Sequence, residues 1–523
     1  MGKIINRIKN SKNKMFIALT AVLLVLNLII NFTVYRGDVF NVHFPWKDMF
    51  GASSFVITTV VGLIFSNLIY LGMKKKIRLE NLYLIVAIPI GLLFMFCNPL
   101  GKVPDEDMHA RKAYAISYGN LFSVANEEGR ATEKMNPKLE KMVARSVSSY
   151  KEARELMALD EDSPDKVLEY STMALYSPIC HMPQGIGMLV SRIFGANLVV
   201  QCYFARLFNM AFSIFLMYMA IKIMPFKKII LFVIGLLPIT MNEFASMSSD
   251  ALAIGFGIFY ISYILGLKNS EGLLTKKQKV MLVIFSIIMA LLKIVYVPIV
   301  FMLLLIPKEK YESKGKRRKF LVCTIVAAII INLLWLAYCS RFLVEYNPGV
   351  DGGKQVAGIL KNPFGYIFIL FRTLNTYAQT FILSLCGEGL GHYNVQTSVL
   401  YVFSSLMLLV VLFFAREEEE IVEYSVFDKV VCTIIFLVIA ALIYTSLYVQ
   451  WTEALKPIIY GVQARYFIPI LPLVSLILDN KNLIIKKWNK AYVALFMLFF
   501  NLNAICMILF TYIDGNVLNF YIK

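Results

Sequence analysis

Three consecutive acids, Asp105, Glu106 and Asp107, are followed closely by His109 in the stretch NPLGKVPDEDMHARKAYAISYGN (98–120). In a helix, Asp105 and Glu106 lie four and three residues before His109, so both carboxylates share a face with the imidazole. Carboxylates beside lipid have raised pKa values, which suits a general base. The stretch directly follows a membrane-length apolar run, so we expect a base with His109 as its orienting partner.

Two other interpretations of these acids stay open. Pro104 suits the first position of a helix, and acids in a first turn offset the helix dipole, so the group can simply mark a helix start. A divalent metal site is the other alternative. We predict no metal, because this motif has one histidine and divalent ions need more ligands.

Further polar residues stand where apolar runs begin or break. Ser249 and Asp250 end the turn NEFASMSSD and open an apolar run, either as a helix cap or as polar groups facing a cavity. Arg465, in GVQARYF, also precedes an apolar run, where its guanidinium can bind a lipid-linked phosphate or simply snorkel to the surface. Lys293 interrupts ALLKIVYVP, and a charge inside a membrane is a functional candidate.

The composition shows what must position these residues. Of 523 residues, 59% are hydrophobic and only 16% are charged, and the apolar residues form long runs. The chain is therefore predicted to be an integral membrane protein. The net charge of +18 comes from short Lys and Arg clusters between apolar runs, which orient membrane helices, so we expect no nucleic-acid partner.

The apolar runs predict an all-α, polytopic membrane protein with about thirteen transmembrane helices. The whole chain, 1–523, is expected to be a single integral membrane domain. A pair of short or broken helices is expected between 280 and 306, where Lys293 and Pro298 interrupt the run. The predicted passes lie near 15–34, 53–73, 80–98, 198–221, 228–242, 248–267, 280–306 (the pair), 320–338, 397–415, 427–449, 463–478 and 490–512.

The basic connections predict the orientation. If the passes alternate, the Lys- and Arg-rich loops at 74–78, 222–228, 267–279, 308–319 and 481–490 all fall on one side, which is then cytoplasmic. The N-terminus is therefore expected inside and the C-terminus outside. The segment 99–197 becomes a large extracytoplasmic loop that carries the acidic motif. The ambiguous stretch 362–387 is placed at the outer interface, because a further pass there breaks the charge alternation.

Several stretches resemble, in order, the blocks of a family of bacterial multi-pass membrane proteins that is grouped with the GT-C glycosyltransferases. They are PDEDMH with RKAY, YSPICHMPQGIGMLVSRIFG, ARLFN, LPITMNEFASMSSDAL, LLKIVYVP and GVQARYFIPILPL. The match covers roughly residues 80 to 480, and the PDExxH and GVQxRYFxPxLPL blocks are its most specific parts. Asp107 stands where many related proteins have a proline, and Ala464 where a glycine is usual.

This resemblance implies an inverting glycosyltransferase with a GT-C-like fold in the bacterial plasma membrane. Its site would lie on the outer face and move a sugar from a polyprenyl-phosphate donor to a cell-envelope glycan. Asp105 or Glu106 would act as the base beside His109, and the additional acid Asp107 leaves open which carboxylate acts. The phosphate and the substrate would be bound by Arg465, Gln463, Lys293, Asp250 and Ser249.

Two other classes of protein share these features. A transporter or flippase of lipid-linked glycans also needs many helices and a polar outer mouth, but transporters place charged sites near the midplane and often show paired repeats. Here the charge inside the apolar runs is nearly confined to Lys293, and no repeat is visible. A non-catalytic subunit of an envelope polysaccharide assembly complex is the third class.

Overall fold

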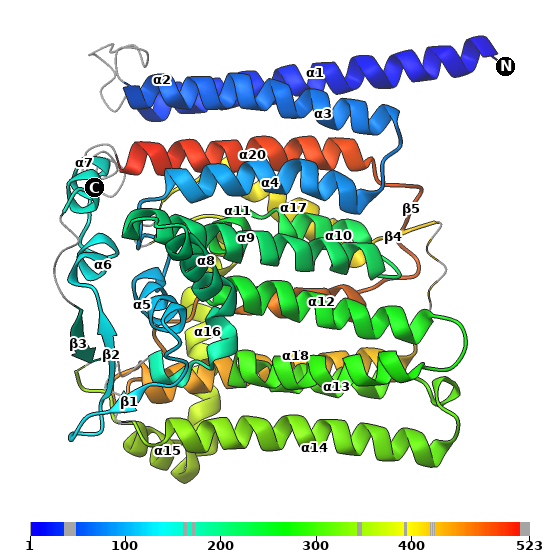
Figure 1. Cartoon of the computed structure of the whole chain (residues 1–523). Helices are drawn as coiled ribbons and strands as arrows, with labels where there is room; N and C mark the ends of the chain where they lie inside the picture. Colours follow the sequence, from blue (N-terminus) through cyan, green and yellow to red (C-terminus); the bar gives the residue numbers. More distant parts are fainter. Residues whose placement is uncertain are drawn as a thin grey trace.

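The computed structural model describes residues 2–35, 49–159, 165–169, 173–342, 348–391, 395–418, 420, 422 and 424–512. Within these residues, eight helices are long and apolar enough to cross a membrane. Most of the long helices run side by side along one direction (Figure 1). The eight are α1 (Gly2–Tyr35), the continuous helix α2, η2 and α3 (Met49–Val56, Ile57–Val61 and Gly62–Lys74), α4 (Leu79–Cys97), α9 (Leu198–Ile223), α12 (Asp250–Asn269), α14 (Lys314–Cys339), α18 (Val426–Gln450) and α20 (Lys490–Thr511).

Shorter helices complete the bundle. Eight of the predicted passes coincide with the long helices, and the rest fall on the shorter ones, so the total of about thirteen crossings stays a prediction. The shorter helices are α10 (Lys228–Gly235), α11 (Pro238–Phe244), α13 (Lys276–Leu292), η5 (Ile294–Leu305), η6 (Lys308–Lys310), α17 (Val399–Phe414), η7 (Ala464–Ile470) and α19 (Leu471–Ile477).

The pair of short helices expected between 280 and 306 is confirmed. Helix α13 ends at Leu292, Lys293 is extended with φ −153°, and the 3₁₀-helix η5 follows. An α-helix of this length and a 3₁₀-helix of 12 residues each cover roughly 25 Å, because the 3₁₀ rise per residue is larger. The break therefore carries Lys293 to one end of the bundle.

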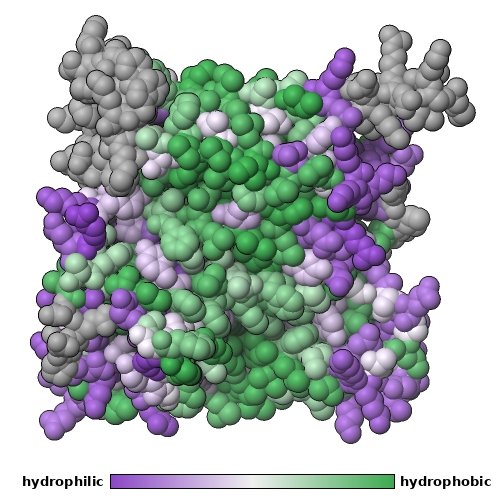
Figure 2. Space-filling model, turned by 45° about the horizontal axis from the view of Figure 1, so that its top comes forward, coloured by the Kyte–Doolittle hydropathy of each residue, from purple (hydrophilic) through white to green (hydrophobic). Residues whose placement is uncertain are grey.

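The two ends of the bundle differ in charge. The basic connections before α4, α10, α13, α14 and α20 lie at the right-hand end in Figure 1, and the segment that follows α4 lies at the other end. Figure 2 shows a broad hydrophobic band between two hydrophilic edges, as expected for a protein that crosses a bilayer. Helix α1 begins and α20 ends at opposite ends (Figure 1), and residues 513–523 lie outside the described residues.

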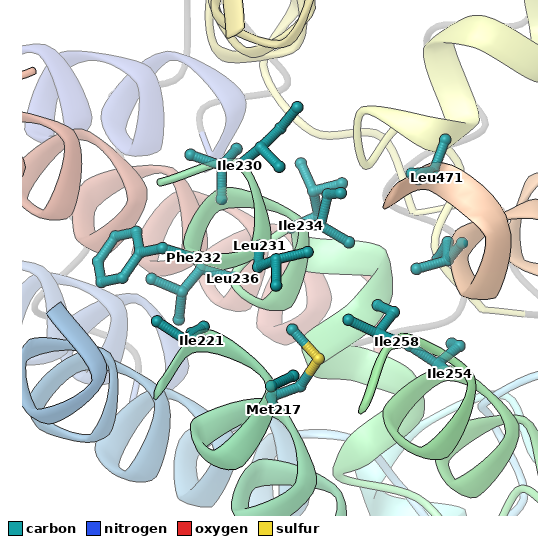
Figure 3. Close-up of a cluster of buried hydrophobic side chains, with 14 of the residues drawn as sticks. Met217, Ile221, Ile230, Leu231, Phe232, Ile234, Leu236, Ile254, Ile258 and Leu471 are labelled. Atoms are coloured by element: carbon teal, nitrogen blue, oxygen red, sulfur yellow. The ribbon is translucent and has the colours of Figure 1, made fainter. Parts of the chain in front are cut away.

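The core is built around α10, which is apolar on every side. Residues 229–235 are all buried, as expected for a helix surrounded by protein. Figure 3 shows its side chains between those of α9, α12 and α19, with Met217 and Ile221 from α9, Ile254 and Ile258 from α12, and Leu471 from α19. The elements that carry the polar site are thus anchored in one continuous core.

The segment 99–197, which is predicted to lie outside the cell and is called the first outer loop below, is a folded cap at the left-hand end of the bundle in Figure 1. Its antiparallel sheet, in the order β1-β2-β3, places Thr132 opposite both Val124 and Glu169. A buried ion pair of 2.7 Å between Lys112 Nζ and Glu133 Oε1 joins α5 to β2. The elements are α5 (Glu106–Ser117), β1 (Val124–Ala125), β2 (Ala131–Met135), α6 (Pro137–Met142), α7 (Tyr150–Met157), β3 (Lys166–Glu169), η3 (Met173–Leu175), η4 (Pro178–His181) and α8 (Met182–Ile193).

The chain is mostly helical, but the expectation of an all-α fold missed two small sheets. The second sheet is a parallel pair, β4 (Arg416–Glu417) and β5 (Ile484–Ile485), at the basic end. All these strands have five residues or fewer, which is too short for an alternating pattern to be recognised in the sequence.

The ambiguous stretch 362–387 forms α16 (Pro363–Leu385), preceded by α15 (Gly352–Lys361). Helix α16 does not meet the criteria for a membrane-length apolar helix and runs across the direction of the long helices (Figure 1). Phe364, Phe368 and Phe371 are 75%, 72% and 64% exposed. The interfacial position of this helix stays a prediction.

Candidate functional site

A cavity of about 420 Å³ lies at the end of the bundle that carries the first outer loop. Its lining includes both polar and apolar side chains, and they come from segments far apart in the sequence. The polar side chains include Asp105, Arg145, Asn242, Glu243, Gln463 and Arg465, and the apolar side chains include Ile239, Phe381, Leu390, Tyr444, Leu447 and Trp451.

Asp105 is the member of the acidic motif that lines this cavity. Its φ of +61° places it in the left-handed region, immediately before α5. Its carbonyl accepts hydrogen bonds from the N–H groups of Met108 and His109, so the helix begins at Glu106. Pro104 was predicted at the first helical position. It lies before the N-cap instead, because the left-handed Asp105 separates it from the helix.

The carboxylate of Asp105 lies between two arginines. Its Oδ1 accepts a 3.1 Å bond from Nη2 of Arg145, and its Oδ2 accepts a bond from Nη2 of Arg465. Burial raises the pKa of Asp105, but Arg465, His109 and Arg145 outweigh burial and hold that pKa below its ordinary range. The expectation of a raised pKa is therefore wrong for Asp105, because the cationic neighbours outweigh the loss of water.

Glu106 has a different environment, since its side chain is fully buried against Arg206. The two side chains form two bonds of 2.7 Å, and Glu106 also accepts from the backbone N–H groups of Gly101 at 2.9 Å and Met247 at 3.0 Å. Arg206 donates further to three carbonyls at the end of α4. A carboxylate that accepts four bonds has little capacity left for a substrate, so this pair ties α5 to α4 and α9.

Asp107 fixes Arg145 from the other side. Its Oδ2 accepts a 2.9 Å bond from Nε of Arg145. Its Oδ1 is buried and has no hydrogen-bond partner within the described residues. The first and third acids of the motif, Asp105 and Asp107, therefore bind the same guanidinium, that of Arg145.

Arg465 is the centre of the site. It is 2% exposed, and its guanidinium meets three carboxylates. Nη2 binds Asp105, Nη1 lies 3.3 Å from Glu243 Oε1, and Nε lies 3.0 Å from Asp250 Oδ2. The planar fork of an arginine allows such divergent contacts, which a lysine cannot reproduce.

Asp250 and Lys293 form an ion pair behind Arg465, and neither lines the cavity. The Lys293 ammonium also lies 5.7 Å from the ring centre of Tyr176 and 5.4 Å from that of Tyr466, within cation–π range. The break between α13 and η5 therefore brings a charge to the start of α12. Asp250 thus lies between two cations, the Lys293 ammonium and the Arg465 guanidinium.

His109 is turned toward a second histidine. Its Nδ1 lies 2.8 Å from Nε2 of His181, and its Nε2 lies 3.4 Å from Oγ of Ser249. Burial lowers the pKa of His109 to about 4, so the ring is neutral at pH 7. The described side-chain hydrogen bonds of His109 do not include Asp105 or Glu106, so the structure does not bring the imidazole onto the predicted base.

The structure brings every predicted site residue to one end of the bundle. Of these, three line the cavity: Asp105, Arg465 and the exposed Gln463. The others support the site from behind, namely Glu106, His109, Ser249, Asp250 and Lys293.

Several ionisable residues of the site were not predicted from the sequence. Glu243 lies in the turn that supplies Ser249 and Asp250, and Arg206 and His181 lie in the ARLFN and YSPICH stretches, so a signal was present for all three. Arg145 belongs to a loop in which charged residues are common, and nothing in the sequence singles it out.

Within the described residues, no group of three or more His, Cys, Asp or Glu side chains is arranged to hold a metal ion. The acids nearest the cavity surround arginines instead: Asp105, Glu243 and Asp250 all face Arg465. A cationic guanidinium at the meeting point of these carboxylates occupies the place that a metal ion would need.

Comparison with known proteins places the chain in a family. No curated protein and no solved structure matches it. One family model, described as a predicted membrane protein (DUF2142), matches residues 88–474. That range includes the start of α5, the start of α12, Lys293 and the GVQARYF segment. The chain therefore belongs to the DUF2142 family of predicted membrane proteins.

Proposed function

We propose that the protein is a glycosyltransferase that moves a sugar from a polyprenyl-phosphate donor to a cell-envelope glycan on the outer face of the membrane. The observation that carries the proposal is the meeting of the Asp105 carboxylate and the Arg465 guanidinium at the wall of a cavity that is lined by both polar and apolar side chains. A base and a phosphate-binding group on one wall are the minimum that such a transfer needs.

The polar and the apolar side chains of the cavity suit the two ends of such a donor. Phe381, Leu390 and Trp451 provide apolar surface for a lipid chain. Arg465 provides the planar donors that bind phosphate oxygens well. Helix α16 also lines the cavity with hydroxyl-bearing side chains, which in this proposal bind the sugar: Thr373, Tyr377, Thr380 and Ser384.

In the proposed reaction the acceptor hydroxyl oxygen attacks the anomeric carbon of the donor. The bond between that carbon and the phosphate oxygen breaks, and polyprenyl phosphate leaves with the bonding electrons. Asp105 takes the hydroxyl proton, and Arg465 stabilises the leaving phosphate. A single displacement of this kind inverts the anomeric centre.

The remaining predicted residues have supporting roles in this proposal. Glu106 positions the start of α5 through Arg206, and the pair of Asp250 and Lys293 positions Arg465. His109 links α5 to Ser249 and His181. Asp105 is assigned as the base because it is the acid of the motif that faces the cavity.

The position of the charged groups favours an enzyme over a transporter. Transporters bind their cargo near the middle of the membrane, between halves that alternate in access. Here Asp105, Arg465 and Lys293 lie at the end of the bundle beside the folded first outer loop. The basic loops occupy the opposite end, and that end faces the cytoplasm under the positive-inside rule.

The proposal is tested by comparing the envelope glycans of cells that have the gene, lack it, or carry Asp105→Asn in its place. Loss of the same side-branch sugar in the last two strains is the expected result. Glu155→Gln, on the exposed face of α7, is the matched control and should restore the sugar. Normal glycans in the Asp105→Asn strain overturn the role of Asp105, and intact lipid-linked units that accumulate on the inner leaflet point to a flippase.

A further inference from the structure

Arg145 and Arg465 line the same cavity and share one carboxylate. Oδ1 of Asp105 is bound by Arg145, and Oδ2 is bound by Arg465. The two arginines are 320 residues apart (465 minus 145) and come from different elements, the first outer loop and η7. A carboxylate held between two guanidiniums has the arrangement in which proteins commonly bind a phosphate.

The contacts of Arg145 suit it to bind a ligand. Its side chain is 45% exposed and lines the cavity. Its backbone is held in place by the buried Lys102, which donates hydrogen bonds to the carbonyls of Ala144 at 3.1 Å and of Arg145 at 2.7 Å. Within the described residues, the side-chain hydrogen bonds of Arg145 to Asp105 and Asp107 use two of its five N–H groups, which leaves donors for a ligand in the cavity.

We propose that Arg145 and Arg465 form a clamp for the phosphate of the lipid-linked donor, and that the Asp105 carboxylate occupies this clamp until the phosphate displaces it. A phosphate presents two anionic oxygens much as a carboxylate does, so it can take both guanidiniums at once. This proposal rests on the proposed function for the identity of the donor.

The exchange also explains how Asp105 becomes a base. A carboxylate bound by two arginines is a weak base, because both cations stabilise its ionised form. When the phosphate takes the arginines, Asp105 loses two counterions and its affinity for a proton rises. The base is therefore activated only after the donor has bound, and the acceptor is not deprotonated in an empty site.

The clamp is tested by measuring the binding of polyprenyl phosphate to the full chain in lipid nanodiscs. Arg145→Gln is expected to weaken binding roughly tenfold or more, and Arg145→Lys to weaken it less. Asp105→Asn is expected to tighten binding several-fold, because the amide does not compete for the arginines. Asparagine tolerates the left-handed backbone at this position, so this variant should fold. Arg154→Gln, on the exposed side of α7, is the matched control and should bind normally.

Two results overturn the clamp: normal binding by Arg145→Gln, or weakened binding by Asp105→Asn. Competition by inorganic phosphate and binding of the phosphate-free polyprenol test whether the clamp binds a lipid-linked phosphate, a free phosphate or the lipid chain alone. Competition by inorganic phosphate only at far higher concentrations supports a lipid-linked ligand, whereas equal competition overturns that assignment. Tight binding of the polyprenol also overturns it.

The binding and transfer assays separate the two proposals. If the arginine dependence holds but no donor supports transfer, the clamp stands and the glycosyltransferase proposal fails. If Asp105→Asn abolishes transfer but Arg145→Gln binds normally, the enzyme stands and the clamp fails.

Discussion

The carboxylate of Asp105 accepts a hydrogen bond from the guanidinium of Arg465, although 360 positions separate the two residues. The contact joins the start of the first outer loop to the start of η7. It forms because α4, which leads into Asp105, and α12, which packs against η7, both pack against α9 in one core. The pairing places an acid and a phosphate-binding group on one wall of a cavity.

Glu106→Gln is predicted to reduce stability more than it reduces the chemical step. The change leaves Arg206 buried beside a neutral amide, and breaking a buried ion pair costs about 3 kcal/mol or more. Thermal unfolding of the purified variant should show a clear fall in midpoint, whereas Glu155→Gln should not. A Glu106→Gln protein with normal stability and no transfer would instead make Glu106 the base.

A stability loss is predicted as the pH falls from about 6.5 toward 4. Burial lowers the pKa of His109 to about 4, below the ordinary value of about 6.5, so the unfolded chain binds this proton more strongly. The sign follows from linkage: the full stability is present above pH 6.5 and decreases as the pH approaches 4, by about 3 kcal/mol for His109. The buried His181, whose pKa is also lowered, acts in the same direction.

Thermal unfolding between pH 7 and pH 4 checks this prediction. His109→Gln should lose less stability over this range than the wild-type protein, while both are compared at equal ionic strength. The same pH dependence in both proteins would show that His109 does not titrate in this window.

Reporter fusions are predicted to place residue 130 outside the cell and residue 272 inside. Arg130 lies between β1 and β2 of the first outer loop, and Gly272 lies in the basic connection between α12 and α13. Alkaline phosphatase, which is active only outside the cytoplasm, should be active at the first position and inactive at the second. The reverse pattern contradicts the assignment of the site to the outer face.

Phe381→Trp is predicted to impair the use of the lipid-linked donor. Phe381 lines the cavity, and its ring packs edge-on against Phe467 with centres 4.9 Å apart. A larger ring at this position can extend into the cavity without displacing Phe467, and there it occupies space that the lipid chain needs. A rise in KM for the donor with little change in unfolding midpoint is the expected outcome. The exposed Phe368→Trp on the same helix is the control.

Much of the architecture could be predicted from the sequence. The thickness of a bilayer requires long apolar runs, and the positive-inside rule places basic residues in the cytoplasmic loops. Asp105, Asp250 and Arg465 were recognised as candidates because each is a charged residue at the end of an apolar run. The small strands of the first outer loop were missed because two to five residues carry no periodic signal.

Partner choice within the site could not be predicted. Spacing along one helix suggested that His109 faces its neighbouring acids, but His181 and Ser249 are brought to it by other elements. The same holds for Glu106, whose partner Arg206 lies on α9, and for Arg145, which becomes distinctive only when the fold places it beside Asp105. Contacts between distant segments decide which acid faces the cavity.

The most direct test of the central claim is the rate of sugar transfer by purified Asp105→Asn protein, measured as release of polyprenyl phosphate from a polyprenyl-phosphate sugar in the presence of the envelope glycan. The substitution should lower the rate by on the order of a hundredfold or more, as expected for loss of a general base, while donor binding is retained. Transfer by Asp105→Asn at the wild-type rate would contradict the account.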